Sequence, residues 1–228
     1  MRQKIAILSG SGLSAESGLP TFRDAAGLWK QHSWVELASP EGWARRPELV
    51  LEFYDERRAK AWRAQPNAAH VAIASLEAKH DVVVITQNVD ALHERAGSTR
   101  VLHLHGELAY ARGTGPGRRR RRIDGEPIRI GQTCEEGTQL RPDIVWFGEV
   151  PYEMERSFAA LAKADLFVSI GTSGAVYPAA GFVQQAKSGG AGTLELNLER
   201  SQGSAWFDES RLGPASELVP SWVEEVLR

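Results

Sequence analysis

Cysteine is almost absent from this sequence. Among 228 residues only Cys134 is a cysteine. This excludes an internal disulfide framework and favours a reducing compartment, so we expect a cytoplasmic protein. Apolar runs long enough to span a membrane are also missing, and the start MRQKIAIL lacks the pattern of a signal peptide. These absences predict a protein without a membrane partner.

An excess of charge of either sign is missing as well. The sequence has 27 lysines and arginines against 29 aspartates and glutamates, a net charge of -2, so no nucleic-acid partner is indicated. A run of five arginines at residues 118–122 is the local exception. It is typical of a solvated loop but would also suit an acidic partner. The length and the hydrophobic content of 42% suit one α/β domain with a small subdomain.

A short apolar run and a glycine turn open the chain. Residues 5–8 are typical of a buried parallel strand, and Gly10, Gly12 and Ala15 fit the pattern G-x-G-x-x-[GA]. Residues 14–17 read as the opening of a helix. This arrangement can hold a pyrophosphate, although an ordinary tight turn has the same pattern. A dehydrogenase is not favoured, because an irregular loop at residues 18–24 replaces the expected second strand with its acidic residue.

The remaining pattern alternates helices with strands. Helices at residues 34–37, 41–46 and 47–62 predict a small helical subdomain, and residues 107–140 are the least regular part. Apolar runs predict strands at residues 81–86, 101–104, 144–147, 166–170 and 193–197, and further helices start at residue 66 and span 153–163, 178–187 and 217–227. This alternation predicts an α/β fold, a parallel sheet wound on both faces.

Polar residues follow several of these strands. They lie at residues 86–90, 171–173 and 197–199, where open α/β sheets bind ligands. Asp90 would also serve as the cap of a helix over residues 91–96. His103 and His105 share one face of a strand, so a metal pair is conceivable, although a core histidine is the commoner outcome.

Taken together, these segments resemble the motifs of the sirtuins, NAD-dependent protein deacylases, in the order of that family. The matching segments are KIAILSGSGLSAESGLPTFRDAAGLW (4–29), TQNVD (86–90), HG (105–106), WFGE (146–149), GTS (171–173), NLE (197–199) and GPAS (213–216). The resemblance implies one sirtuin-type domain over residues 1–228. Its Rossmann-like NAD-binding part would cover about 1–30, 66–106 and 141–228, and its smaller subdomain about 31–65 and 107–140.

The resemblance also implies the roles of individual residues. His105 matches the catalytic histidine, and Asn88 is implied as a second catalytic residue. Imidazole suits a base because it titrates near neutral pH. Phe147, Gly148, Glu149 and Val176 match the segments that hold the peptide substrate as an added strand. The residues implied for NAD are Gly10, Ser11, Gly12, Ala15, Glu16, Thr21, Phe22, Arg23, Trp29, Gln87, Asn88, Val89, Asp90, His105, Gly171, Thr172, Ser173, Asn197, Leu198, Glu199 and Ala215.

The sequence departs from the family in its metal module. Sirtuins bind a structural zinc through four cysteines, whereas this chain has only Cys134. One thiolate cannot form a tetrahedral sulfur site, so the module is degenerate and zinc is not expected. What stabilises residues 107–140 without it is left open at this point.

The acyl group is suggested by one pair of residues. Tyr54 and Arg57 are three positions apart on a predicted helix and therefore share a face. In isolation they suit a charged, solvent-facing stripe. They also match the pair with which class III sirtuins, including bacterial CobB-type enzymes, read the carboxylate of malonyl- or succinyl-lysine.

The expected activity is therefore NAD-dependent removal of succinyl, malonyl and also acetyl groups from protein lysines, with release of nicotinamide and O-acyl-ADP-ribose. The alternatives are an NAD-binding module, an NAD glycohydrolase or an ADP-ribosyltransferase without efficient deacylation.

Overall fold

The strands form two separate sheets. The computed structural model describes residues 2–21, 33–117 and 119–228. The larger sheet has six strands in the order β3-β2-β1-β7-β8-β9, and every neighbouring pair is parallel. Its strands are β1 (Lys4–Ser9), β2 (Asp81–Thr86), β3 (Val101–His103), β7 (Leu166–Ile170), β8 (Gly192–Asn197) and β9 (Glu209–Leu212). The predicted Rossmann-like sheet is confirmed, with β9 added at one edge.

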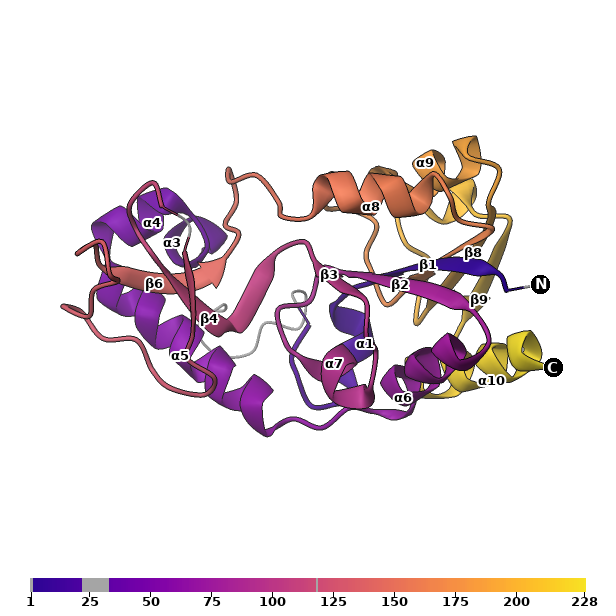
Figure 1. The fold of residues 1–228 in the computed structure, drawn as a ribbon, viewed down its shortest axis with the longest axis horizontal. Coiled ribbons are helices and arrows are strands. Elements are labelled where there is room, and N and C mark those ends of the chain that lie inside the picture. The colour runs from indigo at the N-terminus through magenta and orange to yellow at the C-terminus, as the bar shows by residue number, and fades with distance from the viewer. Residues whose placement is uncertain (1, 22–32, 118) are drawn as a thin grey trace.

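Helices cover both faces of this sheet (Figure 1). The side chains of β1 alternate between two cores. Ile5 and Ile7 enter the core that contains Ala69 and Trp222, whereas Ala6 and Leu8 enter the core that contains Leu161 and Phe182. The helices are α1 (Ser11–Ala15), α6 (Ala68–Ser75), α7 (Leu92–Ala96), α8 (Met154–Leu161), α9 (Phe182–Ser188) and α10 (Ala215–Leu227), with short 3-10 turns at Leu76–Ala78, Ala179–Gly181 and Ser204–Trp206. No helix in the described ranges is long and apolar enough to cross a bilayer.

The strand order changes direction between β1 and β7. From β1 the chain proceeds to β2 and β3 on one side, and it later continues through β7, β8 and β9 on the other. The two turns that follow β1 and β7 therefore leave the sheet beside each other but lead to opposite faces. Open α/β sheets bind ligands in the crevice that forms at such a point.

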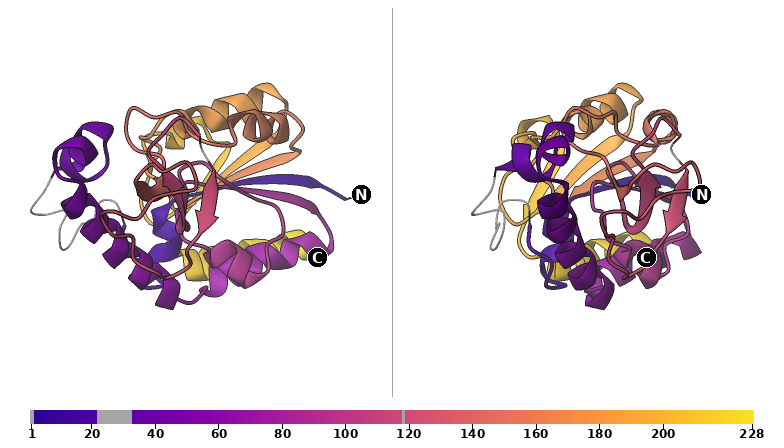
Figure 2. Two further views of the ribbon diagram at one scale, coloured as in Figure 1. Left: turned by 60° about the vertical axis from the view of Figure 1, so that its left-hand side comes forward. Right: turned by 90° about the vertical axis from the view of Figure 1, so that its left-hand side faces the viewer.

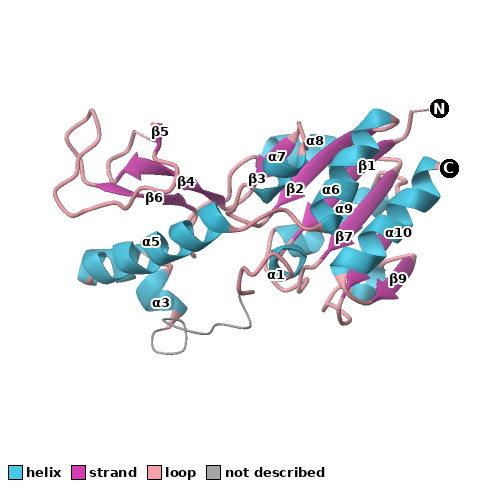
Figure 3. Cartoon of the chain, turned by 90° about the horizontal axis from the view of Figure 1, so that it is seen from below, coloured by secondary structure: helices cyan, strands magenta, loops and turns pink. Residues whose placement is uncertain are grey.

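A smaller part of the chain lies beyond this end of the sheet (Figures 2 and 3). It contains a three-stranded antiparallel sheet in the order β5-β4-β6, against which the longest helix packs through Leu51, Phe53 and Tyr54. Its elements are α3 (Trp34–Leu37), α4 (Pro40–Arg45), α5 (Pro47–Arg63), β4 (Gly106–Gly113), β5 (Arg120–Arg122) and β6 (Leu140–Ile144). The three predicted helices of this part are confirmed.

Two predictions about local structure are wrong. The first helix begins at Ser11, not at residue 14, and it ends after five residues. Residues 144–147 do not add a strand to the parallel sheet. Instead Ile144 ends β6, which pairs with β4 in the antiparallel sheet. The apolar run of residues 144–147 was misleading because the preceding Arg141 and Asp143 are charged yet buried.

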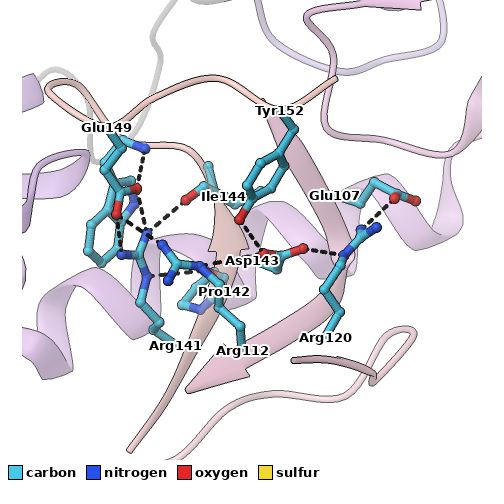
Figure 4. Close-up of polar contacts among 10 residues, drawn as sticks. Glu107, Arg112, Arg120, Arg141, Pro142, Asp143, Ile144, Glu149 and Tyr152 are labelled. Carbon is cyan, nitrogen blue, oxygen red and sulfur yellow. Dashed lines mark hydrogen bonds and ion pairs between the residues drawn. The ribbon is translucent and has the colours of Figure 1, made fainter. Parts of the chain in front are cut away.

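Ion pairs connect the strands of the smaller sheet (Figure 4). The Asp143 carboxylate on β6 is fully buried, accepts hydrogen bonds from Arg120 Nε (2.5 Å) and Tyr152 Oη (2.8 Å), and lies 3.5 Å from Arg112 Nε. Arg120 also reaches Glu107 on β4. Buried charges need such partners to offset the cost of leaving water. The network therefore contributes to holding together the region that the sequence left unexplained.

The arginine run is largely paired within the chain. Arg119 contacts Glu135 at 2.9 Å and Arg122 contacts Asp124 at 2.6 Å, while Arg120 belongs to the Asp143 network. Cys134 lies beside Thr138, with its Sγ 3.2 Å from Thr138 Oγ1. Across residues 2–21, 33–117 and 119–228 no group of three or more His, Cys, Asp or Glu side chains is placed to hold a metal ion.

Replacement of Asp143 should destabilise the protein. Asp143→Asn keeps the shape but removes the charge that faces Arg112 and Arg120. Each arginine retains a second carboxylate as a partner. We therefore expect the free energy of unfolding, measured with urea, to fall by about 3 kcal/mol, the lower end of the range for breaking a buried ion pair. Asp124→Asn is the matched control. It removes an exposed partner of Arg122 and should cost less than about 1 kcal/mol. Equal losses in the two variants would contradict a stabilising role for the network.

Candidate functional site

A cavity of about 730 Å³ lies between the carboxyl ends of the parallel strands and the smaller part of the chain. Both parts contribute to its wall. Most of the predicted site residues line it: Gly10, Ser11, Gly12, Thr21, Gln87, Asn88, Val89, Asp90, His105, Gly171, Thr172, Ser173, Asn197, Leu198 and Glu199 on the side of the sheet, with Tyr54, Arg57, Phe147, Gly148, Glu149 and Val176. Residues from six of the seven matching segments, together with Tyr54, Arg57 and Val176, are thus brought to one space.

The floor of the cavity is formed by two glycine turns in direct contact. Gly12 N–H donates to Gly171 O at 2.8 Å. A Cβ atom on Gly10 would lie 2.7 Å from Gly171 O, and one on Gly12 would lie 2.8 Å from it, which no real side chain tolerates. Gly171 also has a φ of +62°, which favours glycine. The glycines are therefore required for the packing of the two turns against each other, which in turn shapes the cavity.

The segment after β2 is fixed by buried polar side chains. Asn88 Nδ2 donates to Gly10 O and to Ser14 Oγ, both at 3.0 Å. Ser14 Oγ donates in turn to Asp90 Oδ2 at 3.1 Å, and the other Asp90 oxygen accepts the N–H of Leu92 at the start of α7. Burial raises the pKa of Asp90, while these two hydrogen bonds lower it. Asp90 thus holds the first N–H of α7, although Ala91 occupies the N-cap position, and it also lines the cavity.

The strand ends are joined across the site. Thr172 Oγ1 after β7 donates to Gln87 Oε1 after β2 at 2.8 Å, and Asn197 Nδ2 after β8 donates to Thr172 O at 2.8 Å. Hydroxyl, amide and backbone groups thus form one polar wall with little freedom to move. Such a wall suits a polar ligand that has several hydrogen-bonding groups, as a dinucleotide has.

His105 presents one ring nitrogen for chemistry. Its Nδ1 lies 3.1 Å from Gln87 O, and because a carbonyl oxygen only accepts, Nδ1 must carry a hydrogen. In the neutral ring Nε2 then has a free lone pair. Burial lowers the pKa of His105, and the hydrogen bond to Gln87 raises it by less. His105 is therefore a neutral imidazole at neutral pH, able to accept a proton at Nε2.

His103 differs from His105 because both of its ring nitrogens have partners and its pKa is raised. Its Nε2 lies 2.8 Å from Glu94 Oε1 and its Nδ1 lies 3.2 Å from Asn88 O. Burial alone would lower the pKa of His103, but Glu94, together with Glu107 and the carbonyl of Asn88, outweighs burial and raises it. A protonated ring can donate to both partners at once, which holds the backbone of Asn88. The conceivable metal pair of His103 and His105 has no third ligand among the described side chains.

Tyr54 and Arg57 form the far end of the cavity. Tyr54 is only 4% exposed and Arg57 is half-buried in the cavity wall, so the two residues are not a solvent-facing stripe. Trp146 Nε1 donates to Tyr54 Oη at 3.1 Å. Burial raises the pKa of Tyr54 to about 12, with Arg57 acting in the other direction. The phenol is therefore uncharged and available as a hydrogen-bond donor.

The segment with Phe147 forms the rim. The Phe147 side chain is 39% exposed, and its ring lies 4.7 Å from that of Trp34. The carboxylate of Glu149 is occupied within the protein, because it accepts hydrogen bonds from Arg112, Arg141 and the N–H of Trp146. Its role is to hold this turn, and Phe147 lines the cavity beside it.

Some predicted residues lie elsewhere. Ala15, Glu16 and Ala215 are outside the described lining of the cavity, and Glu16 instead accepts hydrogen bonds from Ser216 at the start of α10. Phe22, Arg23 and Trp29 lie outside the described residues.

The sequence reasoning missed Ser14, Trp146 and the pairing of His103 with Glu94. Ser14 was visible in the first motif but was read only as a helix start. The other two depend on contacts between distant segments, which no local pattern indicates.

Comparisons with known proteins agree with this geometry. Residues 10–178 match the model of the Sir2 family. The chain is 49% identical over 238 residues to the NAD-dependent protein deacylase of Caulobacter vibrioides, covering 98% of this chain and 97% of that protein. It superimposes on a Sir2 homologue in complex with NAD with a TM-score of 0.91, at 39% identity over 99% of this chain and 90% of the other. A Sir2 complex with a p53 peptide and NAD gives a TM-score of 0.82 at 27% identity, with 97% and 92% covered.

The pKa values of the two neighbouring histidines should be shifted in opposite directions from the ordinary value. We expect the pKa of His105 to lie below the ordinary 6.5 because of burial, and the pKa of His103 to lie above 6.5 because of Glu94. Titration of the ring protons by NMR measures both, with His105→Ala and His103→Asn used for assignment. Glu94→Gln should lower the pKa of His103 and leave that of His105 in place. A His105 pKa at or above 6.5 would contradict the tautomer and the buried neutral base.

Proposed function

This chain belongs to the Sir2 family and is an NAD-dependent protein deacylase, and we propose that it removes acidic acyl groups, succinyl and malonyl, from protein lysines and accepts acetyl groups as well. The pair Tyr54 and Arg57 would hold the distal carboxylate of the acyl chain. We also place the enzyme in the cytoplasm, because a single cysteine suits a reducing compartment.

The observation that carries this proposal is that the Arg57 side chain has no ion-pair partner among the described residues. Its guanidinium lines the cavity, and burial lowers its pKa. No hydrogen bond or ion pair connects it to any residue in the described part of the chain, and its Cζ lies 5.5 Å from the ring centre of Phe53. The carboxylates of Asp90 and Glu56 act on it only from beyond ion-pair distance, and a partly buried cation without an ion-pair partner is unfavourable. A carboxylate on the acyl group would supply that charge through two parallel hydrogen bonds.

The neighbouring Arg58 shows what a paired arginine looks like on the same helix. Arg58 is buried, its Nε donates to Leu108 O at 2.7 Å, and it forms an ion pair with Asp55. Arg58 is therefore part of the packing between α5 and β4. The contrast supports a ligand-binding role for Arg57, because the two side chains are adjacent in sequence and differ in having a carboxylate partner.

The polar wall at the strand ends fits NAD. The glycine turns leave no side chain over the floor, and Gln87, Asn88, Asp90, Thr172, Ser173 and Asn197 offer amides, hydroxyls and a carboxylate to a dinucleotide. NAD supplies nicotinamide as the leaving group and receives the acyl group. We propose that Asn88 and Asp90 orient the nicotinamide end, because both are buried and held by Ser14. His105 acts as the base, and its Nε2 atom accepts a proton from a hydroxyl group.

The protein substrate would bind along the rim as an added strand. Phe147 and Tyr177 expose their rings beside the cavity, with 39% and 75% of their surfaces accessible. Val176 lies next to Tyr177 and also lines the cavity. Two apolar edges suit an extended peptide whose acyl-lysine enters between them. The solved Sir2 complex with a p53 peptide supports a peptide substrate.

Replacement of Arg57 should change the acyl preference. Arg57→Met keeps the apolar stem and removes the fork. It should lower kcat/KM for a succinyl-lysine peptide by roughly 10- to 150-fold, which corresponds to a hydrogen bond to a charged partner. Hydrolysis of an acetyl-lysine peptide should change little or improve, because acetyl has no distal carboxylate. Both rates are measured with NAD by mass spectrometry of the peptides.

The control is Arg63→Met on the exposed last turn of α5, outside the cavity lining, which should change neither rate. If Arg57→Met lowers both rates equally, the acidic-acyl proposal fails while the deacylase assignment stands. Release of nicotinamide at the same rate without any acyl peptide would instead identify a glycohydrolase.

A further inference from the structure

Trp146 connects the acyl end of the cavity to the ion-pair network of the smaller sheet. Its indole is 2% exposed, and its Nε1 donates to Tyr54 Oη at 3.1 Å. The guanidinium of Arg141 stacks on the indole, with Cζ 3.2 Å from the ring centre. The ring of Trp43 lies 5.8 Å away. The stacking of Arg141 thus fixes the plane of the indole, and the hydrogen bond to Tyr54 marks its N–H direction.

The hydrogen-bond roles at Tyr54 follow from simple counting. An indole N–H can only donate, whereas a phenol donates one hydrogen and accepts through its lone pairs. Tyr54 Oη must therefore accept from Trp146. Its own hydrogen is then directed elsewhere, and the described part of the chain offers that hydrogen no acceptor. A carboxylate near Arg57 would be such an acceptor.

Arg141 is itself held from several sides. Its Nη1 donates to Glu149 Oε1 at 2.8 Å, and its Nη2 donates to Ile144 O at 2.7 Å and to Glu149 Oε2 at 3.1 Å. Glu149 also accepts the backbone N–H of Trp146 at 2.8 Å and a hydrogen bond from Arg112. The backbone and the ring of Trp146 are therefore fixed by the same two charged residues (Figure 4 shows Arg141, Glu149 and Arg112).

We infer that Trp146 is a positioning residue for acyl specificity: its indole, held by Arg141 and Glu149, donates to the Tyr54 hydroxyl and so directs the hydrogen of that hydroxyl toward the carboxylate of an acidic acyl group. This inference rests on the proposed acidic-acyl function and adds to it the residue that orients the donor. It also links the ion pairs that connect the smaller sheet to the choice of substrate.

The test is a double-mutant cycle on the ratio of kcat/KM for succinyl-lysine to that for acetyl-lysine peptides. Trp146→Phe keeps an aromatic ring beneath Arg141 but removes the N–H. We expect it to lower the ratio by about two- to tenfold, the range for one net hydrogen bond. In the Tyr54→Phe background the same change should leave the ratio unaltered, because no hydroxyl remains to be oriented. A merely structural role for Trp146 would depress both substrates and would persist in that background.

Two further variants complete the experiment. Trp43→Phe is the control, since Trp43 contacts the Trp146 ring but not Tyr54 Oη, and its ratio should match the parent. Arg141→Lys removes the guanidinium that stacks on the Trp146 indole. We expect it to lower the ratio in the parent and to leave the ratio unchanged in the Tyr54→Phe background. This variant also decides the matter if Trp146→Phe does not fold, as judged by its thermal midpoint.

The outcomes separate the two proposals. If Tyr54→Phe lowers the ratio but Trp146→Phe and Arg141→Lys do not, the positioning role is wrong and the acidic-acyl function stands. If Trp146→Phe lowers the ratio equally in both backgrounds, its effect does not depend on the Tyr54 hydroxyl, and the positioning role is also wrong. If neither Arg57→Met nor Tyr54→Phe changes the ratio, the acidic-acyl function fails and the positioning role fails with it.

Discussion

The contact between the turns after β1 and β7 determines where this molecule can bind a ligand. These turns meet through backbone atoms, with Gly12 N–H bonded to Gly171 O and no room for a Cβ on Gly10. Because the turns are so close, Asn88 reaches Gly10 and Ser14, and Thr172 reaches Gln87. Gln87, Asn88, Thr172 and Asn197, which we assign to NAD binding, are thus positioned around this contact at the switch point of the sheet.

The second determinant is the placement of charge in the smaller part of the chain. Asp143, Arg112, Arg141 and Glu149 are charged groups that lie wholly or largely out of water, and each has a partner of opposite sign. Arg57 differs because it lines the cavity without a carboxylate partner among the described residues. The same physical rule thus explains both groups: a desolvated charge requires a counter-charge, which the protein provides in the first case and the substrate would provide in the second.

The sequence allowed much of the fold and most of the site to be predicted. The strands 81–86 and 166–170 were clear because parallel strands buried on both faces are continuous apolar runs, and the polar motifs after them converge as expected. The strand predicted at 144–147 was wrong, because β6 carries buried charges that look like a polar loop. The edge strand β9 has no apolar run to reveal it. The link from Glu149 through Arg141 and Trp146 to Tyr54 joins segments about 90 residues apart, a pairing that local patterns do not encode.

The most direct test of acidic-acyl recognition is a competition in one reaction. Equal amounts of succinyl-lysine and acetyl-lysine forms of the same peptide are mixed with the enzyme and NAD, and the loss of each is followed by mass spectrometry. The ratio of their initial rates is the ratio of kcat/KM, independent of enzyme concentration. If Arg57 and Tyr54 recognise a carboxylate, the succinyl peptide disappears first, and NAD is required for both losses. Preferential loss of the acetyl peptide, or equal loss of the two, would contradict that recognition.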